Sequence, residues 1–225
     1  MRERKQRIIH DLQEHLRFLS EAGVDFISTS SSQEEVPQAA SDFQELIDTI
    51  LVCEKCPLAA SRTLAVPGEG CAQADLMFVG EGPGHDEDIQ GKPFVGKAGQ
   101  LLTKIIQAMD LSREDVYITN IVKCRPPGNR NPHHDEINSC APYLKQQLEM
   151  IKPKVIVSLG NVPTKHLLET ASGISALRGR FQTYGGIQIM PTFHPSYLVR
   201  NEQNRELRRL VWGDMKKVMA VLAGK

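Results

Sequence analysis

The sequence predicts an α/β fold in which helices cover both faces of a mostly parallel sheet. Short apolar runs, each long enough for one buried strand, alternate with longer segments whose apolar residues recur at helical spacing. A glycine-rich loop directly follows the first run, which is typical of a backbone that approaches a ligand closely. The four expected strands are residues 76–79, 116–123, 155–159 and 187–190.

The first 40 residues form a section of their own. Residues 1–27 carry apolar side chains on one face of an amphipathic helix. Residues 28–40 are polar, lack periodicity and predict a linker. Ser41 is the expected capping residue of the next helix. We therefore expect a helical extension and linker over residues 1–40 and one domain over residues 41–225.

Helical patterns separate the expected strands and follow the last one. In each pattern apolar residues recur every three or four positions, so one face of the helix is buried. Parallel strands need such crossover connections, and the alternation therefore supports a parallel sheet. The expected helices are residues 97–111, 135–151, 162–170 and 205–222.

The composition is that of an ordinary globular protein. The 225 residues, 40% of them hydrophobic and 24% charged, suffice for one sizeable core. No apolar run approaches the roughly 20 residues of a membrane span, and the charged N-terminus lacks the apolar block of a secretory signal. Five cysteines, an odd number, argue for thiolates in a reducing compartment. We expect a cytoplasmic monomer with no membrane partner.

The formal net charge of zero hides an asymmetry along the chain. Residues 1–52 hold 5 basic and 10 acidic side chains, and the remainder holds 22 basic and 17 acidic ones. A basic core with an acidic arm fits a partner with a phosphate backbone, although such an excess also serves solubility.

Four of the cysteines have the spacing of metal ligands. Cys53 and Cys56 form a Cys-x2-Cys pair, and Cys124 and Cys140 form a second pair. Four thiolates complete either a tetrahedral zinc site or a four-iron cluster, and the spacing does not choose between them. A thioredoxin-like redox role is disfavoured because the first pair follows a helix rather than a strand. The remaining alternative is a set of unrelated buried thiols.

Polar side chains stand where the expected strands end. In open α/β sheets, ligand sites gather beyond the carboxyl ends of the strands. Glu81 follows the first strand, Asn120 lies in the second, and the third and fourth are followed by Asn161 and His194. Phe94, in a loop bounded by glycines, offers a flat face for a planar ligand. Each of these residues also has an ordinary structural interpretation, in the core or in a turn.

Taken together, these motifs resemble those of the iron-sulfur uracil-DNA glycosylases of family 4. The match runs from about residue 51 to the C-terminus and includes all four paired cysteines. Its motifs are residues 80–88, 91–102, 119–130 and 194–198. The resemblance implies a three-layer α/β/α fold with a central four-stranded parallel sheet. It also implies a monofunctional glycosylase of base excision repair, which releases uracil from single- and double-stranded DNA and leaves an abasic site.

The resemblance further implies roles for individual residues. A structural [4Fe-4S] cluster is expected on Cys53, Cys56, Cys124 and Cys140. The expected contacts of uracil are Gly80, Glu81, Gly82, Phe94, Asn120 and His194. The expected DNA contacts are Arg125, Arg130 and Ser196.

The chemistry of such a reaction fits these residue types. A carboxamide such as Asn120 pairs a donor with an acceptor, which complements the N3–H and O4 edge of uracil, whereas cytosine presents the reverse pattern. Bond cleavage leaves a uracil anion, and a neutral His194 that donates to O2 is suited to stabilise it. The carboxylate that acts on water is expected to be Glu81, with Glu87 as the second candidate and Asn129 assisting.

One position departs from a better-known glycosylase family, whose loop reads Gly-Gln-Asp-Pro-Tyr-His. The aspartate that assists water in that family corresponds to Gly82 here. If no other carboxylate replaces it, the alternative is a catalytically weak iron-sulfur module that binds nucleic acid as an accessory of repair or replication. Residues 1–40 lie outside the family core and are candidates for docking a repair or replication protein.

Overall fold

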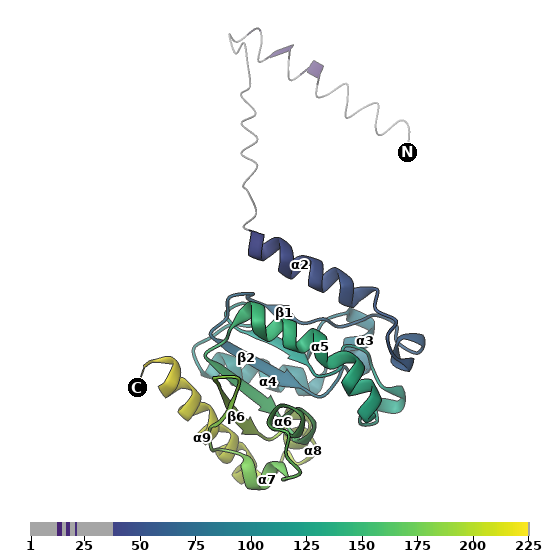
Figure 1. The fold of residues 1–225 in the computed structure, drawn as a ribbon. Helices are drawn as coiled ribbons and strands as arrows, with labels where there is room; N and C mark the ends of the chain where they lie inside the picture. The colour runs from purple at the N-terminus through teal and green to yellow at the C-terminus, as the bar shows by residue number, and fades with distance from the viewer. Residues whose placement is uncertain (1–12, 15–16, 19–20, 22–37, 225) are drawn as a thin grey trace. The chain divides into compact units, whose positions relative to one another are not determined.

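Four parallel strands form the centre of the sheet in a computed structural model of the protein (Figure 1), which describes residues 13–14, 17–18, 21 and 38–224. Within these residues the strand order is β1-β3-β2-β4-β6-β5. The strands are β1 (Glu69–Gly70), β2 (Leu76–Gly80), β3 (Tyr117–Asn120), β4 (Val155–Leu159), β5 (Gln182–Tyr184) and β6 (Ile187–Thr192). The predicted α/β class is confirmed, and the four expected strands are the parallel ones. The short edge strands β1 and β5 run antiparallel to their neighbours and were not predicted.

Side chains alternate along the central strands between two cores, one on each face of the sheet. Met77 and Val79 face the core covered by α2 (Gln38–Leu51), α5 (His134–Ile151) and α6 (Asn161–Leu168). Leu76 and Phe78 face the opposite core, against α4 (Lys97–Ala108) and α9 (Arg205–Leu222). This period of two follows from the pleat of a strand that is buried on both sides. The result is the expected three-layer arrangement (Figure 1).

The connections at the carboxyl ends of the strands contain short helices that the sequence analysis missed. An isolated turn or two carries too few residues to show helical periodicity. These helices are α3 (His85–Gln90), α7 (Ile174–Leu177) and α8 (Pro195–Arg200), with a 3-10 turn at Pro127–Asn129; a further 3-10 turn, Pro57–Ala60, lies between α2 and β1. None of the described helices has the length and apolar content required to span a bilayer.

The helix before the paired cysteines begins earlier than predicted. α2 starts at Gln38, so Ser41 lies inside the helix and does not cap it. Of the expected helix over residues 1–27, only residues 13–14, 17–18 and 21 are described, and they are helical; the rest of it lies outside the described residues. The expected linker, except for its last three residues, also lies outside them, and the domain boundary at residue 40 stays a prediction.

The register of the parallel strands brings distant residues together at one edge of the sheet. Gly80 at the end of β2 pairs with Asn120 at the end of β3. Leu159 at the end of β4 pairs with Thr192 at the end of β6. Because all four strands point the same way, the segments that leave them meet above the same edge.

Candidate active site

A cavity of about 640 Å³ opens at this edge of the sheet. It is lined by all four residues that were singled out at the strand ends, namely Glu81, Asn120, Asn161 and His194. Other predicted site residues line it too, namely Gly82, Glu87, Phe94, Asn129, Arg130 and Ser196. Arg125 lies next to this set, where its Nε donates to Asn129 Oδ1 at 2.7 Å. The register and the loops thus gather side chains that are more than 100 residues apart in the chain.

Asn120 presents an unused hydrogen-bond acceptor at the cavity. Its side chain is 1% exposed. Among the described residues, its Oδ1 is the one buried side-chain oxygen or nitrogen atom that has no hydrogen-bond partner. Leaving a buried acceptor unpaired costs about 1–3 kcal/mol. The site is therefore built to receive a hydrogen-bond donor at this atom.

Asn120 and Phe94 both pack against Gly80. A Cβ atom at Gly80 would lie 2.5 Å from Phe94 Cζ and would also collide with Asn120 Oδ1, so this position tolerates no side chain. The Phe94 ring is buried, and its centroid lies 5.7 Å from that of His194 at an interplanar angle of 32°. Glycine at position 80 thus lets the amide of Asn120 and the ring of Phe94 both pack directly against the main chain at the end of β2.

His194 is a neutral side chain with a defined tautomer. Its Nδ1 accepts a hydrogen bond from the backbone N–H of Ser196 at 3.1 Å, and it lies 2.8 Å from the Ser196 hydroxyl. Because a backbone nitrogen only donates, Nδ1 is unprotonated and Nε2 carries the proton. Burial, with Arg200 as a second cause, lowers the pKa of His194 to about 4. The ring therefore offers an Nε2–H donor across the neutral pH range.

The two candidate carboxylates differ in their surroundings. Within the described part of the chain, nothing hydrogen-bonds to the carboxylate of Glu81, and burial raises its pKa above the usual value. Glu87 is fully engaged: one oxygen accepts the backbone N–H of Gly84 at 3.1 Å, and the other accepts those of Val95 and Gly96, each at 2.9 Å. This contrast favours Glu81 as the group that is available to water.

Packing explains why Gly82 carries no carboxylate. A Cβ atom at this position would lie 2.7 Å from Cγ2 of Val122, which is itself buried. An aspartate could enter only if the Val122 side chain, or the segment after β3 that carries it, shifted. The departure noted in the sequence is therefore part of how the loop after β2 packs.

The two arginines that were expected to contact DNA are both tied to neighbours. Arg130 makes a two-pronged pair with Glu136, at 2.8 Å and 2.6 Å, and this bond to Arg130 is the main cause that lowers the pKa of Glu136 to about 2. Arg125 lies 3.1 Å from the His85 ring in addition to its bond with Asn129. The carboxylate of Glu136 offsets the positive charge of Arg130. The role of Arg125 and Arg130 in binding DNA therefore stays a prediction.

The four paired cysteines line a second cavity. All are free thiols, and burial raises the pKa of Cys140 to about 11. Hydrogen-bond donors point at the sulfur atoms: Arg62 Nη1 lies 3.0 Å from Cys124 Sγ, and the Lys123 backbone N–H lies 3.3 Å from Cys140 Sγ. Within the described ranges, no three His, Cys, Asp or Glu side chains are gathered to hold a metal ion. The four thiols nevertheless line one cavity, and donors to the sulfur atoms are the kind of group that hydrogen-bonds to thiolate ligands.

Lys123 lines the second cavity, contacts the main chain of Asn120 and was missed in the sequence. It is 1% exposed, and its Nζ donates to Thr119 Oγ1 at 2.5 Å, Asn120 O at 2.8 Å and Gln147 Oε1 at 2.7 Å. It thereby fixes the main chain of Asn120, while its own backbone N–H meets Cys140. Its position beside Cys124 was visible in the sequence, but its three partners come from separate elements that no local pattern relates.

Comparisons with known proteins agree with this geometry. Residues 67–216 match the family model described as the uracil DNA glycosylase superfamily. A type-4 uracil-DNA glycosylase of Saccharolobus solfataricus is 46% identical over 189 residues, which cover 80% of this chain and 86% of that protein. Proteins of the same name are 46% identical in Thermotoga maritima, over 76% of this chain and 89% of that one, and 40% identical in Archaeoglobus fulgidus, over 80% and 93%.

Proposed function

Because this chain belongs to the type-4 uracil-DNA glycosylases of the uracil DNA glycosylase superfamily, we propose that it excises uracil from DNA. The enzyme is a hydrolase that cleaves the bond between N1 of uracil and deoxyribose. Its products are free uracil and an abasic site, which base excision repair then processes. Single- and double-stranded DNA both serve as substrates in this proposal, because a flipped or unpaired base is what the cavity receives.

The observation that carries the proposal is the unpaired Oδ1 of Asn120 beside the Phe94 ring. Uracil carries an N–H at position 3, which supplies the donor that this oxygen lacks. Cytosine has an unprotonated N3 and would set two acceptors against each other. Phe94 supports a planar base by stacking, a contact worth about 1–3 kcal/mol. The pair therefore selects uracil over cytosine without a direct contact to the sugar.

The remaining residues fit a hydrolytic mechanism. As the glycosidic bond breaks, negative charge develops on the uracil ring, and a neutral His194 donates its Nε2–H to O2 in this proposal; the tautomer and the low pKa of the ring support the role. The sugar develops positive charge, which the free carboxylate of Glu81 stabilises while it orients the attacking water. Asn129 remains a candidate to assist, although its Oδ1 accepts a bond from Arg125.

Replacing Asn120 by alanine is expected to lower the rate of uracil release by about 5- to 150-fold. This range corresponds to the discrimination of about 1–3 kcal/mol that a side-chain amide provides when it pairs with the edge of a base. The measurement is release from an oligonucleotide that contains one deoxyuridine, followed by alkaline cleavage of the abasic site. Asn138→Ala, an exposed amide on α5, is the control and is expected to behave as the wild type. Equal release by the wild type and Asn120→Ala would remove Asn120 from base reading.

The alternative of a catalytically weak nucleic-acid-binding module makes the opposite prediction. That module would bind deoxyuridine-containing DNA and release no uracil. The unpartnered Glu81 and the oriented His194 argue against it, since binding a base needs neither. The same release assay on the wild type separates the two functions.

We also propose that Cys53, Cys56, Cys124 and Cys140 hold a [4Fe-4S] cluster. Support comes from the one cavity that these thiols share and from the Arg62 donor to Cys124. When bound, the cluster would serve as a structural cross-link between the end of α2 and the segment after β3. That segment contains Arg125 and adjoins Asn120, so the link would stabilise the base-reading side of the site.

Purified protein is expected to contain about four iron and four acid-labile sulfide atoms per chain. Cys124→Ser is expected to lose most of both and to unfold at a lower temperature, because a structural metal group contributes its binding free energy to folding. Cys71→Ser, which changes a cysteine outside the second cavity, is the control and should retain both elements. One zinc ion per chain and no sulfide would instead establish the zinc site.

Three further expectations concern the protein in its cell. We propose that it acts as a cytoplasmic monomer and that residues 1–40 dock a repair or replication protein. Support for the cytoplasm comes from the odd number of cysteines, and support for the docking role from the acidic excess of residues 1–52. Sedimentation of the full chain and retrieval of partners with and without residues 1–40 test these proposals.

A further inference from the structure

Phe94, the aromatic residue expected to stack on uracil, has an unusual backbone conformation. Phe94 has φ of 52°, in the left-handed region that side chains other than glycine rarely adopt. A conformation of this kind persists only where the surrounding structure holds it. Phe94 is also packed tightly from behind, since a Cβ atom at Gly99 of α4 would collide with its carbonyl group. The ring direction therefore depends on whatever holds the loop from residue 93 to residue 96.

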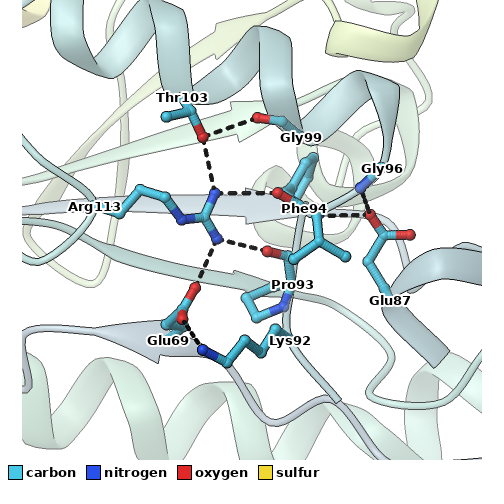
Figure 2. Close-up of polar contacts among 10 residues, drawn as sticks. Glu69, Glu87, Lys92, Pro93, Phe94, Gly96, Gly99, Thr103 and Arg113 are labelled. Carbon is cyan, nitrogen blue, oxygen red and sulfur yellow. Dashed lines mark hydrogen bonds and ion pairs between the residues drawn. The ribbon is translucent and has the colours of Figure 1, made fainter. Parts of the chain in front are cut away.

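Arg113 holds the carbonyl side of this loop (Figure 2). Its Nη1 donates to Phe94 O at 3.1 Å, and its Nη2 donates to Pro93 O at 2.6 Å. The same guanidinium reaches Thr103 Oγ1 at 3.3 Å. A planar guanidinium presents its donors on separate nitrogen atoms in a fixed fork that fits two successive carbonyl groups, whereas the donors of an ammonium group all lie on one nitrogen at the end of a flexible stem. Arg113 is not one of the residues that line the cavity, so it acts on Phe94 from outside.

Glu87 holds the amide side of the same loop. Its Oε1 accepts the backbone N–H groups of Val95 and Gly96, the two residues that follow Phe94 (Figure 2). Its Oε2 accepts the N–H of Gly84, in the glycine loop after β2. One carboxylate therefore joins the loop under the base to the loop that contains Glu81. Charged groups of opposite sign thus bind the peptide groups on both sides of Phe94.

The edge strand β1 supplies the support for Arg113. Glu69 lies on this strand, and its Oε2 accepts from Arg113 Nη2 at 2.8 Å. Its other oxygen pairs with the exposed Lys92 at 3.3 Å. β1 is only two residues long, yet its pairing with β3 fixes where Glu69 stands. The strand therefore contributes to the site without touching it.

We propose that Arg113 and Glu87 are positioning residues that hold Phe94 in its left-handed conformation and so orient its ring for stacking on the excised base. The inference rests on the proposed uracil chemistry and adds to it a support that lies outside the cavity. Without Arg113, the two carbonyl groups lose their common donor, and the loop relaxes to a conformation in which the ring leaves its position against Gly80. Base affinity falls as a result, whereas contacts to the DNA backbone do not change.

A double-mutant cycle between Arg113 and Phe94 tests the proposal. Uracil release in single turnover and inhibition by free uracil are measured for the wild type, Arg113→Met, Phe94→Ala and the double variant. Arg113→Met is expected to weaken both by about tenfold, within the range of coupled contacts. In the Phe94→Ala background the same change is expected to have less than about a twofold effect, because no ring remains to be oriented. Equal losses in both backgrounds would overturn the proposal.

Three further measurements distinguish a positioning role of Arg113 from a general defect in folding. Binding of an oligonucleotide with an abasic site, which presents no base to stack, is expected to be unchanged in Arg113→Met; a parallel loss would indicate a structural defect and count against the proposal. Lys92→Met removes only the exposed partner of Glu69 and should match the wild type. Arg113→Lys keeps the charge without the fork and is expected to show a smaller loss of the same kind; full wild-type behaviour would contradict the role of the fork.

Hydrogen exchange provides a readout that needs no activity. The amides of Val95 and Gly96 are expected to exchange faster in Arg113→Met than in the wild type, while those of β4 keep their protection. Unchanged exchange at these two amides would overturn the proposal even if activity fell. If the wild type released no uracil, the proposed function would fail, and the exchange data would still decide whether Arg113 holds this loop.

Discussion

Glu81→Gln is expected to lower the rate of uracil release by about 10²–10⁴-fold, the usual contribution of a positioned acid–base group. Glutamine keeps the size of the side chain but removes its negative charge. The variant then neither orients water as a base does nor offsets the positive charge that develops on the sugar. Because Glu87 is held by three backbone N–H groups, it is not expected to take over.

The pH dependence of the rate identifies this carboxylate. Burial raises the pKa of Glu81 above its usual value of 4.5, and the ionised form is the active one. The wild-type rate is therefore expected to fall as pH decreases through a value above 4.5, and Glu81→Gln should lack this acidic limb. Glu114→Gln, at an exposed position before β3, serves as the control. An unchanged limb in Glu81→Gln would assign the titration to another group.

His194→Ala is expected to lower the rate of uracil release by about 10²–10³-fold, the cost of losing one donor to a developing oxyanion. The effect should appear in single-turnover kinetics and leave the binding of abasic DNA nearly unchanged. His166→Ala is the control, because burial lowers the pKa of His166 as well but the residue lies on α6 outside the cavity. A similar loss in both variants would point to a general effect of removing a half-buried histidine.

The low pKa of His194 gives this prediction its pH signature. With a pKa of about 4, the ring stays neutral from pH 8 down to about pH 5, so its protonation produces no inflection near pH 6.5. If the imidazolium were the active form, the rate would instead rise as pH falls toward the pKa of about 4, where this form becomes populated. The pH–rate profile of Glu81→Gln, which lacks the titration of Glu81, shows whether the neutral or the protonated form of His194 is active.

Much of the fold was predictable because its signals are local. The strand β4 and the helix α9 agree with the predicted ranges, since a period of two or of 3.6 residues is visible within a single segment. Strands β1 and β5 were missed because two or three residues carry no period, and their existence depends on the neighbour that pairs with them. Ser41 was misplaced because α2 continues upstream of a residue that fits a cap equally well.

Part of the candidate site was also predictable from the sequence, and part was not. The residues at the strand ends were found in the sequence because a parallel sheet sends every strand end to one edge, whatever the details of packing. The family motifs also identified the reaction, which the comparisons support.

Three features of the site are absent from any local pattern and exist only in the folded chain. Asn120 Oδ1 is left without a partner, Glu87 is tied to backbone amides while Glu81 is free, and Arg113 holds Phe94 from 19 residues away. Side-chain types and spacing state which groups are present, but not which of them find partners. Hydrogen bonds to backbone atoms leave almost no trace in residue identity, because every residue has a carbonyl group and all but proline have an N–H. The sequence therefore determined which chemical groups the site contains. The role of each group depends on its hydrogen-bond partners, and only the packing of distant segments in the tertiary structure decided those.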